Sequence, residues 1–344
     1  MTGTAQIYIK SRFAVCTALK VTTTWTKHRG FPLGISTFVV YTRGTVPKVD
    51  DRTMRFDYDV VDFKKINTTA ASGQEIEIAG TIPKTWPATA HAQQTGDWTA
   101  TKTLDQFARM TPAHFAHTLR YAPGQGMGSG AADAVFGVYQ TIITLTSPPG
   151  WLGPNPWVGK PAMFAPRWDA GKYLGNPTGG GNPANRGGAS FSYAPTLNYS
   201  TKADAPERGV ALHIQKAFTH PGATKPPNGN KKVPGQDADH SLHRLYLDAR
   251  RRKDNRARAV TNCRKYFGAD YTAGGKDCDE FPFATTYEGS AQAEYDPHVE
   301  KNNFSVLPVK SGESQDAGIL LAQFYKKNRI IDGMDDGFLV KITP

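Results

Sequence analysis

The sequence predicts two domains: an all-β sandwich or barrel over residues 1–200 and a smaller domain of helices and strands over residues 205–344. Three observations support this fold class. The chain has 344 residues, which is more than a single hydrophobic core usually organises. It contains 34 Gly and 24 Pro, and these residues favour turns between short strands over long helices. Convincing helical periodicity is concentrated in the second half of the chain.

The first half contains five segments in which β-branched and aromatic residues mostly alternate with polar ones. These segments are 6–10, 37–42, 55–63, 74–82 and 136–147. Such alternation is typical of strands with one buried face, and the turn residues between them favour an antiparallel sandwich or barrel. A short helix, broken at Pro112, is expected within 103–120. The Gly- and Pro-rich segment 177–188 predicts a long surface loop and lacks the Lys-Ser/Thr of a phosphate-binding loop.

The second half predicts two helices and a closing strand. A basic helix is expected over 241–265, because apolar residues recur at helical spacing as the Arg-rich run begins. A second helix is expected around 317–329, followed by a strand over 337–342. The Pro- and Gly-rich segment 219–240 predicts a flexible excursion.

Net charge, hydropathy and cysteine content narrow the possible classes of function. The net charge of +11 creates a positive potential that attracts polyanions, although it also serves solubility. No apolar run reaches the roughly 18 residues of a membrane-spanning helix, so no span is expected. Cys263 and Cys278 flank a short segment that a disulfide would close in an oxidising compartment. Cys16 would then be a free thiol or pair with a cysteine outside this sequence.

An acidic stretch, GGKDCDEFPFATTYEG at 274–289, follows the basic helix. Asp279 and Glu280 are adjacent, so in regular structure their side chains cannot point the same way. The stretch is either a solvated acidic turn or a site that holds a divalent cation against phosphate. Cation sites of the second kind use one or two carboxylates and leave positions open for water and phosphate oxygens.

Three segments resemble the NucA/NucB-type bacterial deoxyribonucleases. The family signature runs Asp-Glu-aromatic-Pro, a short apolar segment and Glu-Gly, and it matches Asp279, Glu280, Phe281, Pro282, Ala284, Glu288 and Gly289. ALHIQKAF at 211–218 is similar to the family's Ala-x-His-Ile segment and singles out His213. ESQDAG at 313–318 corresponds to its Asp-Asn segment, with Glu313 and Ser314 at those two positions.

The resemblance covers roughly residues 209–344, with 219–240 as an insertion. In addition, IYIKSRFAVC at 7–16 resembles the opening of β-rich modules that precede such domains in larger secreted bacterial proteins. Residues 1–15 lack the apolar core of a signal peptide, so secretion is expected from the resemblance alone.

The resemblance implies a secreted endodeoxyribonuclease that uses Mg²⁺ or Mn²⁺ and cuts DNA without sequence preference. Asp279 and Glu280 are the expected metal ligands, and His213, Glu280 and Glu288 are the expected catalytic residues. The expected substrate-binding residues are Arg251, Arg252, Arg256, Lys276, Ser314 and Gln315. A disulfide between Cys263 and Cys278 would hold the segment that carries Asp279. If the protein is a toxin, a cognate inhibitor protein is also expected.

Two alternatives stay open. The first is a secreted adhesin for polysaccharide or DNA that keeps the nuclease fold with weak or no activity; Ser314 and the tryptophans Trp151, Trp157 and Trp168 favour it. The competing interpretation of these tryptophans is packing beneath long loops. The second is a cytoplasmic nucleic-acid-binding protein, which would leave Cys263 and Cys278 reduced. The histidine pairs His114/His117 and His240/His243 have no cysteine or carboxylate nearby in sequence that would indicate a site, so they are expected at the surface.

Overall fold

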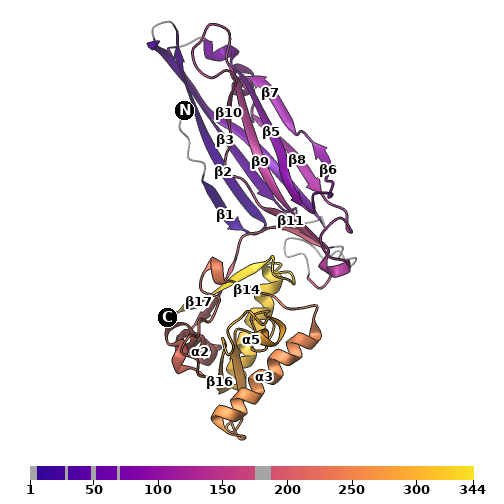
Figure 1. The fold of residues 1–344 in the computed structure, drawn as a ribbon. Coiled ribbons are helices and arrows are strands. Elements are labelled where there is room, and N and C mark those ends of the chain that lie inside the picture. The colour runs from indigo at the N-terminus through magenta and orange to yellow at the C-terminus, as the bar shows by residue number, and fades with distance from the viewer. Residues whose placement is uncertain (1–5, 28–29, 48–51, 68–69, 175–186) are drawn as a thin grey trace. The chain divides into compact units, whose positions relative to one another are not determined.

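The chain divides into two compact units, Met1–Tyr193 and Ala194–Pro344. A computed structural model describes residues 6–27, 30–47, 52–67, 70–174 and 187–344 (Figure 1). The loop expected over 177–188 lies almost entirely outside these residues. Among the described helices, none is long and apolar enough to cross a lipid bilayer.

The N-terminal unit consists of two antiparallel sheets (Figure 1). One contains, in spatial order, β1 (Ile7–Ser11), β2 (Ala14–Thr26), β3 (Pro32–Thr45), β4 (Thr53–Ile66), β8 (His114–Arg120) and β6 (Gln93–Gly96). The other contains β12 (Gly188–Phe191), β11 (Pro166–Asp169), β9 (Ala134–Thr146), β5 (Glu75–Trp86) and β7 (Thr99–Thr103), and β10 (Trp157–Gly159) also pairs with β9. The five segments expected as strands fall in β1, β3, β4, β5 and β9, so the all-β prediction for the first half is confirmed.

Side chains from both sheets meet in one hydrophobic core. In β4 the alternation buries Phe56, Tyr58 and Val60. Phe56 stacks on Tyr139 of β9 with ring centroids 3.6 Å apart, which joins the two sheets face to face. Trp168 is also fully buried, in agreement with the packing interpretation of that tryptophan.

The expected short helix is α1 (Leu104–Arg109), which begins with a capping box between Thr103 and Gln106. After Pro112 the chain continues as strand β8. The prediction that His117 lies at the surface is wrong. His117 is buried, its Nε2 lies 2.8 Å from the Tyr139 hydroxyl, and its ring stacks on Trp98 at 3.9 Å. The alternation of β8 points this side chain inward, a feature that histidine spacing alone does not reveal.

The C-terminal unit combines two small sheets with helices, which confirms the α+β prediction for the second half. Its strands are β13 (Thr196–Ser200), β14 (Leu242–His243), β15 (Lys276–Phe281), β16 (Ser305–Lys310) and β17 (Gly337–Thr343). Its α-helices are α2 (Arg208–Thr219), α3 (Ala249–Phe267), α4 (Gln292–Tyr295) and α5 (Ser311–Lys327). One sheet has the order β13-β17-β14, and β15 and β16 form an antiparallel pair.

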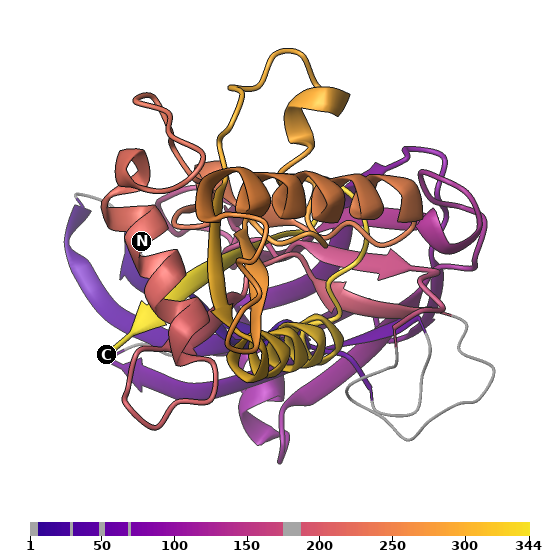
Figure 2. The ribbon, with the colours of Figure 1, turned by 90° about the horizontal axis from the view of Figure 1, so that it is seen from below.

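The β15–β16 pair is the centre of this unit, because α2, α3 and α5 all pack against it (Figure 2). α5 follows β16 directly, and its buried residues Ala317, Leu321 and Phe324 recur at helical spacing. On another side, Ala259 and Cys263 of α3 pack with Cys278 of β15. The acidic segment is therefore held on a rigid hairpin between helices.

Two boundaries differ from the sequence predictions. α3 begins at Ala249, because Asp248 caps it by accepting a hydrogen bond from the Arg251 backbone N–H, and residues 242–243 form strand β14 instead. β13, assigned by sequence to the first domain, pairs in parallel with β17 of the second unit. The first unit therefore ends at Tyr193, before the expected boundary at residue 200.

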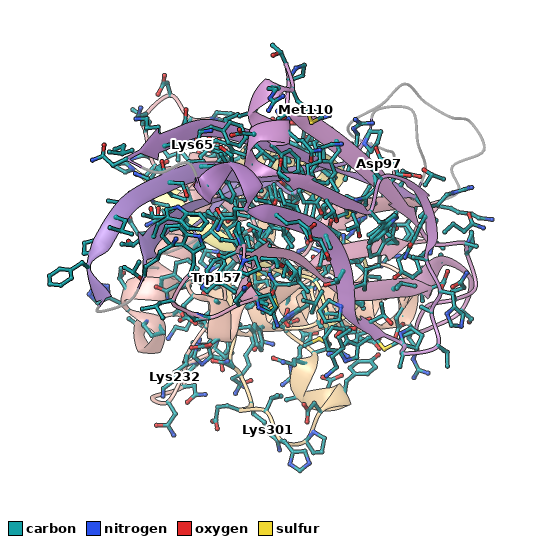
Figure 3. All side chains as sticks on the ribbon, turned by 90° about the horizontal axis from the view of Figure 1, so that it is seen from above. Lys65, Asp97, Met110, Trp157, Lys232 and Lys301 are labelled. Carbon is teal, nitrogen blue, oxygen red and sulfur yellow. A yellow bond between two sulfur atoms is a disulfide. The ribbon has the colours of Figure 1, made fainter. Side chains whose placement is uncertain are left out.

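The excursion over 219–240 contains two short 3-10 turns, Pro221–Ala223 and Ala238–His240. The Lys232 backbone N–H donates to Asn303 Oδ1 (2.7 Å), and the Asn228 side chain donates to the Lys301 carbonyl (2.9 Å). Lys232 and Lys301, labelled in Figure 3, mark the two loops that these bonds join. The excursion is therefore bound to the rest of the unit by specific contacts.

Candidate active site

Asp279 and Glu280 lie next to each other on β15. The regular pairing of β15 with β16 sends their side chains to opposite faces, as sequence reasoning predicts. Asp279 contacts α2 through His213, whereas Glu280 lies within the electrostatic reach of Arg256 on α3. The hairpin thus presents one carboxylate toward each of two helices.

His213 holds Asp279 in place. Its Nδ1 donates to Asp279 Oδ2 (2.6 Å), and its Nε2 lies 2.7 Å from Ser305 Oγ at the start of β16. His213 is only 2% exposed and belongs to the apolar face of α2 that packs on the hairpin. Because both ring nitrogens are engaged, the imidazole fixes the orientation of Asp279 and can accept a proton from water only after one of these bonds breaks. Ser305 is a partner that the sequence analysis did not single out.

Glu280 is a buried carboxylate without a hydrogen-bond partner. Its side chain is 5% exposed, and neither carboxylate oxygen has a partner within the described part of the chain. Burial raises the pKa of Glu280 to about 8, against the opposing charge of Arg256 and with the Asp279 charge adding to the increase. Without a ligand, this carboxyl group is therefore mostly protonated at neutral pH, and a nearby positive charge would favour its ionised form.

A pocket of about 310 Å³ brings most of the predicted site residues together. It is lined by Tyr199, Val210, Arg256, Asp277, Cys278, Asp279, Glu280, Phe283, Ala284, Thr285, Ser314, Gln315, Ala317, Gly318 and Leu321. Ser314 and Gln315 come from the first turns of α5, and the Ser314 hydroxyl is buried with no partner among the described residues. Carboxylates, a guanidinium and an unsatisfied hydroxyl therefore share one concave site.

Glu288 lies outside this pocket. Its Oε1 is 2.7 Å from His243 Nδ1, and its Oε2 accepts a hydrogen bond from the His243 backbone N–H (2.9 Å). Both oxygens thus join the loop that follows β15 (residues 282–291, called the acidic loop below) to β14. The expectation that His243 has no carboxylate company is wrong, because the two residues are distant in sequence and only the fold brings them together.

The basic helix contributes one residue to the pocket. The Arg256 side chain donates to the Cys278 carbonyl and lines the site. Arg251 instead lies between Tyr287 and Tyr295, with its guanidinium 4.9 and 4.6 Å from their ring centroids. Arg252 lies over Tyr246 at 5.2 Å.

Lys276 is exposed at the start of β15. The predicted substrate-binding set therefore divides between the pocket, which Arg256, Ser314 and Gln315 line, and the surface around it.

Asn255, in the middle of the Arg-rich run, anchors the acidic loop to α3. Its side-chain amide donates to the carbonyls of Ala284 (3.0 Å) and Thr286 (3.1 Å), and its Oδ1 accepts from the Ala291 N–H (3.0 Å). Gly289 lies so close that a Cβ at this position would collide with the Asn255 side chain, which explains glycine after Glu288. The sequence analysis missed Asn255, since a polar residue in a charged helix gives no signal of burial.

Cys263 and Cys278 form a disulfide that joins α3 to β15 directly before Asp279. Cys16, in the other unit, is a half-buried free thiol. Within the described residues, no group of three or more His, Cys, Asp or Glu side chains is arranged to hold a metal ion. The carboxylates available to a cation at this pocket are those among its lining residues, Asp277, Asp279 and Glu280, and the last two leave opposite faces of β15.

One family of known proteins matches part of this unit. The family model of deoxyribonuclease NucA/NucB matches residues 234–340, and this confirms the resemblance over that range. The match contains Asp279, Glu280, Glu288 and Ser314, whereas His213 lies before its first residue. No curated protein matches the sequence.

Proposed function

We propose that the C-terminal unit is a metal-dependent endodeoxyribonuclease that cuts DNA without sequence preference. The deoxyribonuclease family match supports the reaction class. The observation that carries the metal dependence is the buried Glu280 carboxylate, neither oxygen of which has a hydrogen-bond partner among the described residues. A divalent cation is the partner that this arrangement accommodates with least rearrangement, because a hard cation prefers carboxylate oxygens.

Glu280 would hold Mg²⁺ or Mn²⁺, and Asp279, whose side chain leaves the other face of β15, would add its negative charge at the same pocket. When bound, such a cation supplies charge neutralisation for the scissile phosphate and makes a nearby water more acidic. The fit rests on the donor set, two carboxylates at a pocket that also contains the unsatisfied Ser314 hydroxyl. In this proposal Glu280 contributes to catalysis through its charge.

Asp279 is the residue we assign to orient the attacking water. His213 holds one of its oxygens, Oδ2, and leaves Oδ1 for the cation or for water. The His213–Ser305 bond in turn fixes the imidazole, so the carboxylate is held in one orientation before substrate binds. His213 is thus a positioning residue, and its catalytic importance follows from the geometry it imposes on Asp279.

Arg256 and Lys276 are suited to bind the phosphate backbone. Arg256 lines the pocket and Lys276 is exposed on the same strand as Asp279. Ser314 and Gln315 lie in the first turns of α5, where backbone N–H groups and the helix dipole favour an anion. Phosphate contacts carry no sequence information, so cutting should be sequence-independent and binding should weaken steeply with salt.

Glu288, Arg251 and Arg252 support the site from outside the pocket. Glu288 joins the acidic loop to His243, and Arg251 donates to the Tyr287 carbonyl of the same loop (2.7 Å). Arg252 packs on Tyr246. Substituting these residues should lower activity by loosening the loop, with less effect on metal binding than substituting Glu280.

We also propose that the protein acts outside the cytoplasm. The Cys263–Cys278 disulfide supports this location, because disulfides persist in oxidising compartments. If its DNA target is that of a competitor, the producing cell needs a cognate inhibitor, and the +11 charge favours an acidic one.

Plasmid nicking tests the proposed reaction. The full chain is assayed with Mg²⁺, with Mn²⁺ and with EDTA, alongside Asp279→Asn, Glu280→Gln and the control Asp270→Asn, which changes an exposed carboxylate in the turn after α3. We expect metal-dependent nicking that is lost in the first two variants and kept in the control. Wild-type protein that binds DNA but does not cut it with any metal would favour the inactive adhesin, and restoring asparagine at Ser314 would be the next step.

A further inference from the structure

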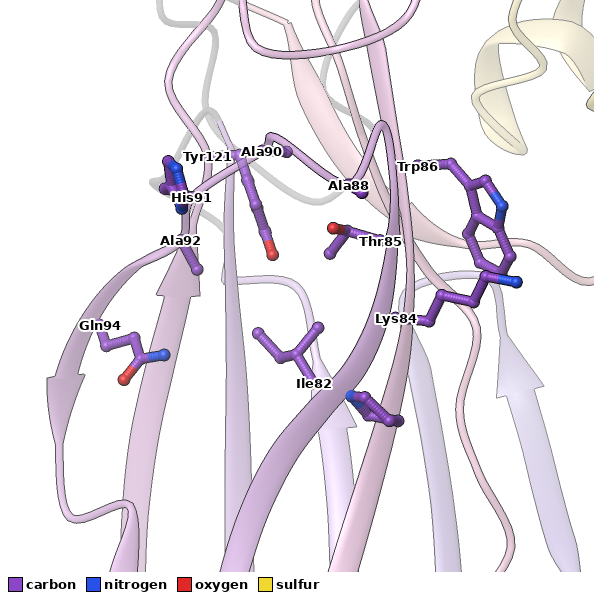
Figure 4. Close-up of a pocket in the computed structure, with 11 residues that line it drawn as sticks. Ile82, Lys84, Thr85, Trp86, Ala88, Ala90, His91, Ala92, Gln94 and Tyr121 are labelled. Atoms are coloured by element: carbon purple, nitrogen blue, oxygen red, sulfur yellow. The ribbon is translucent and has the colours of Figure 1, made fainter.

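A second pocket, of about 600 Å³, lies in the N-terminal unit and is unrelated to the nuclease site. It is lined by Ile82, Pro83, Lys84, Thr85, Trp86, Ala88, Ala90, His91, Ala92, Gln94 and Tyr121 (Figure 4). The pairing of β5 with β7 ends at Ala79, so the later part of β5 has no strand neighbour on that side. β6 is the last strand of the other sheet. The pocket thus opens where each sheet ends, and its volume is in the range of small-molecule sites.

The Tyr121 hydroxyl is the observation that marks this pocket as a binding site. Tyr121 is 1% exposed, and its ring is held against the buried Trp168 with centroids 4.5 Å apart. Its hydroxyl points into the pocket (Figure 4), where a ligand can reach it. Burial raises the pKa of Tyr121 to about 12, so the hydroxyl stays neutral and able to donate. Because the ring is fixed by burial and only the hydroxyl faces the pocket, Tyr121 offers a ligand one hydrogen-bonding group in a fixed position.

Apart from Lys84 and His91, the other polar side chains that line the pocket are neutral hydrogen-bonding groups. Figure 4 shows the Thr85 hydroxyl and the Gln94 amide directed toward the same space as the Tyr121 hydroxyl. His91 is fixed at the rim by its backbone N–H, which donates to Gln125 Oε1 (2.7 Å). No carboxylate is among the lining residues, and the ammonium group of Lys84 is placed over the Trp86 ring at 4.7 Å. Together these groups suit an uncharged ligand with several hydroxyl or amide groups.

An extended peptide that pairs with the backbone of β5 would be an unfavourable ligand for this pocket. Pro83 lies in the bulge of β5 and Pro87 follows its last residue, and neither can donate a backbone hydrogen bond. An added peptide strand would therefore find an interrupted ladder. Ile82 and the alanines 88, 90 and 92 add a small apolar wall. A ring with hydroxyl groups at its edge and C–H groups on its face matches this combination better than an extended peptide does.

We propose that this pocket binds a neutral saccharide unit, with the Tyr121 hydroxyl, the Gln94 amide and the Thr85 hydroxyl as its polar contacts. The N-terminal unit would then attach the protein to a glycan-bearing surface. This inference is independent of the nuclease proposal, because every residue of the pocket belongs to the N-terminal unit.

Isothermal titration of the full chain with cellobiose, maltose and N,N′-diacetylchitobiose tests the proposal. At least one disaccharide should bind at a single site. Tyr121→Phe removes one hydroxyl without opening a cavity and should weaken that binding about fivefold, the value of one hydrogen bond of about 1 kcal/mol. Gln94→Ala should weaken it by a similar factor.

Two control variants separate a local effect from a folding defect. Gln93→Ala changes the preceding β6 residue, whose side chain points to the other face of the strand and is absent from the pocket lining. Tyr41→Phe removes a hydroxyl from a partly exposed tyrosine on β3. Both should bind like the wild type. The proposal is overturned if none of the disaccharides binds, if Tyr121→Phe and Gln94→Ala bind like the controls, or if a capped Val-Thr-Val-Thr-Val peptide binds the pocket instead.

Discussion

Two buried carboxylates, one in each unit, show the difference between a structural and a functional acidic group. In the N-terminal unit, Asp133 accepts hydrogen bonds from the backbone N–H groups of Gly124 (2.8 Å) and Gly126 (2.6 Å) and lies 3.4 Å from Arg52 Nη1. In the C-terminal unit, Glu280 is buried to a similar degree and has none of these contacts. Burial alone therefore does not distinguish the two groups, but their partners do.

This difference in partners separates a carboxylate that stabilises the fold from one that we assign to function. Asp133 joins Gly124 and Gly126 of its own loop to Arg52, which directly precedes β4, so removing its charge should destabilise the fold. Without a ligand, burial of the Glu280 carboxyl group costs folding free energy. Such a group is typical of a functional site, where a bound ligand offsets the cost of burial.

Asp133→Asn should destabilise the N-terminal unit by about 3–5 kcal/mol, since it breaks the buried ion pair with Arg52. Glu280→Gln replaces a buried carboxyl whose pKa is raised to about 8 by a neutral amide of the same size, so it should leave the stability of its own unit unchanged or raise it. Urea unfolding can follow both units in the intact chain. All six tryptophans lie in the N-terminal unit, whereas the long helices that dominate the circular dichroism lie in the other. Equal destabilisation by the two substitutions would show that Glu280 is as important for stability as Asp133.

Acid should weaken the N-terminal unit through His117. Burial lowers the pKa of His117 to about 4, from 6.5 in the unfolded chain. The unfolded state therefore binds the proton more readily, so the stabilisation is complete above pH 6.5 and is lost as the pH falls to 4. The expected loss is about 3 kcal/mol, measured by tryptophan fluorescence in urea at a series of pH values.

His117→Gln should flatten this pH dependence, whereas His91→Gln, at an exposed histidine of the same unit, should retain it. An unchanged profile in His117→Gln would show that another group is responsible for the acid sensitivity.

His213→Ala should lower nicking activity about 10- to 100-fold, the usual effect of removing a residue that orients a ligand or catalytic group. The substitution frees Asp279 Oδ2 and leaves Ser305 without its buried partner. His213→Gln keeps a donor and should recover part of the activity, which a purely structural role would not require. The matched control is His220→Ala, because His220 is the exposed residue that caps the end of the same helix. Full activity of His213→Ala would remove this residue from the site.

Sequence reasoning located the carboxylates but not all of their partners. Alternation of period two was enough to place β4 and β9, because each strand buries one face. The acidic segment was recognisable because Asp279, Glu280 and Glu288 follow a compact local pattern. The pairing of Glu288 with His243, however, joins residues far apart in sequence and depends on how β14 meets the loop. Local patterns carry no information about such contacts.

The start of α3 shows a second limit of prediction from sequence. Apolar spacing from Leu242 onwards predicted helix, but residues 242 and 243 pair with β17, and the Asp248 cap begins the helix later. Tertiary pairing overrode local periodicity there. Tyr121 and Asn255 were missed for a related reason. Whether a polar group is buried, and whether it is satisfied, depends on neighbours that only the folded chain brings together.

The most direct test of the central claim is Mn²⁺ binding to the full chain, measured by isothermal titration for the wild type, Glu280→Gln and the control Asp270→Asn. We expect the wild type and Asp270→Asn each to bind one Mn²⁺. Glu280→Gln should bind at least tenfold more weakly while its helices unfold at the same or a higher urea concentration. Equal Mn²⁺ affinity in all three proteins would contradict the claim that the unpartnered carboxylate of Glu280 exists to hold a cation.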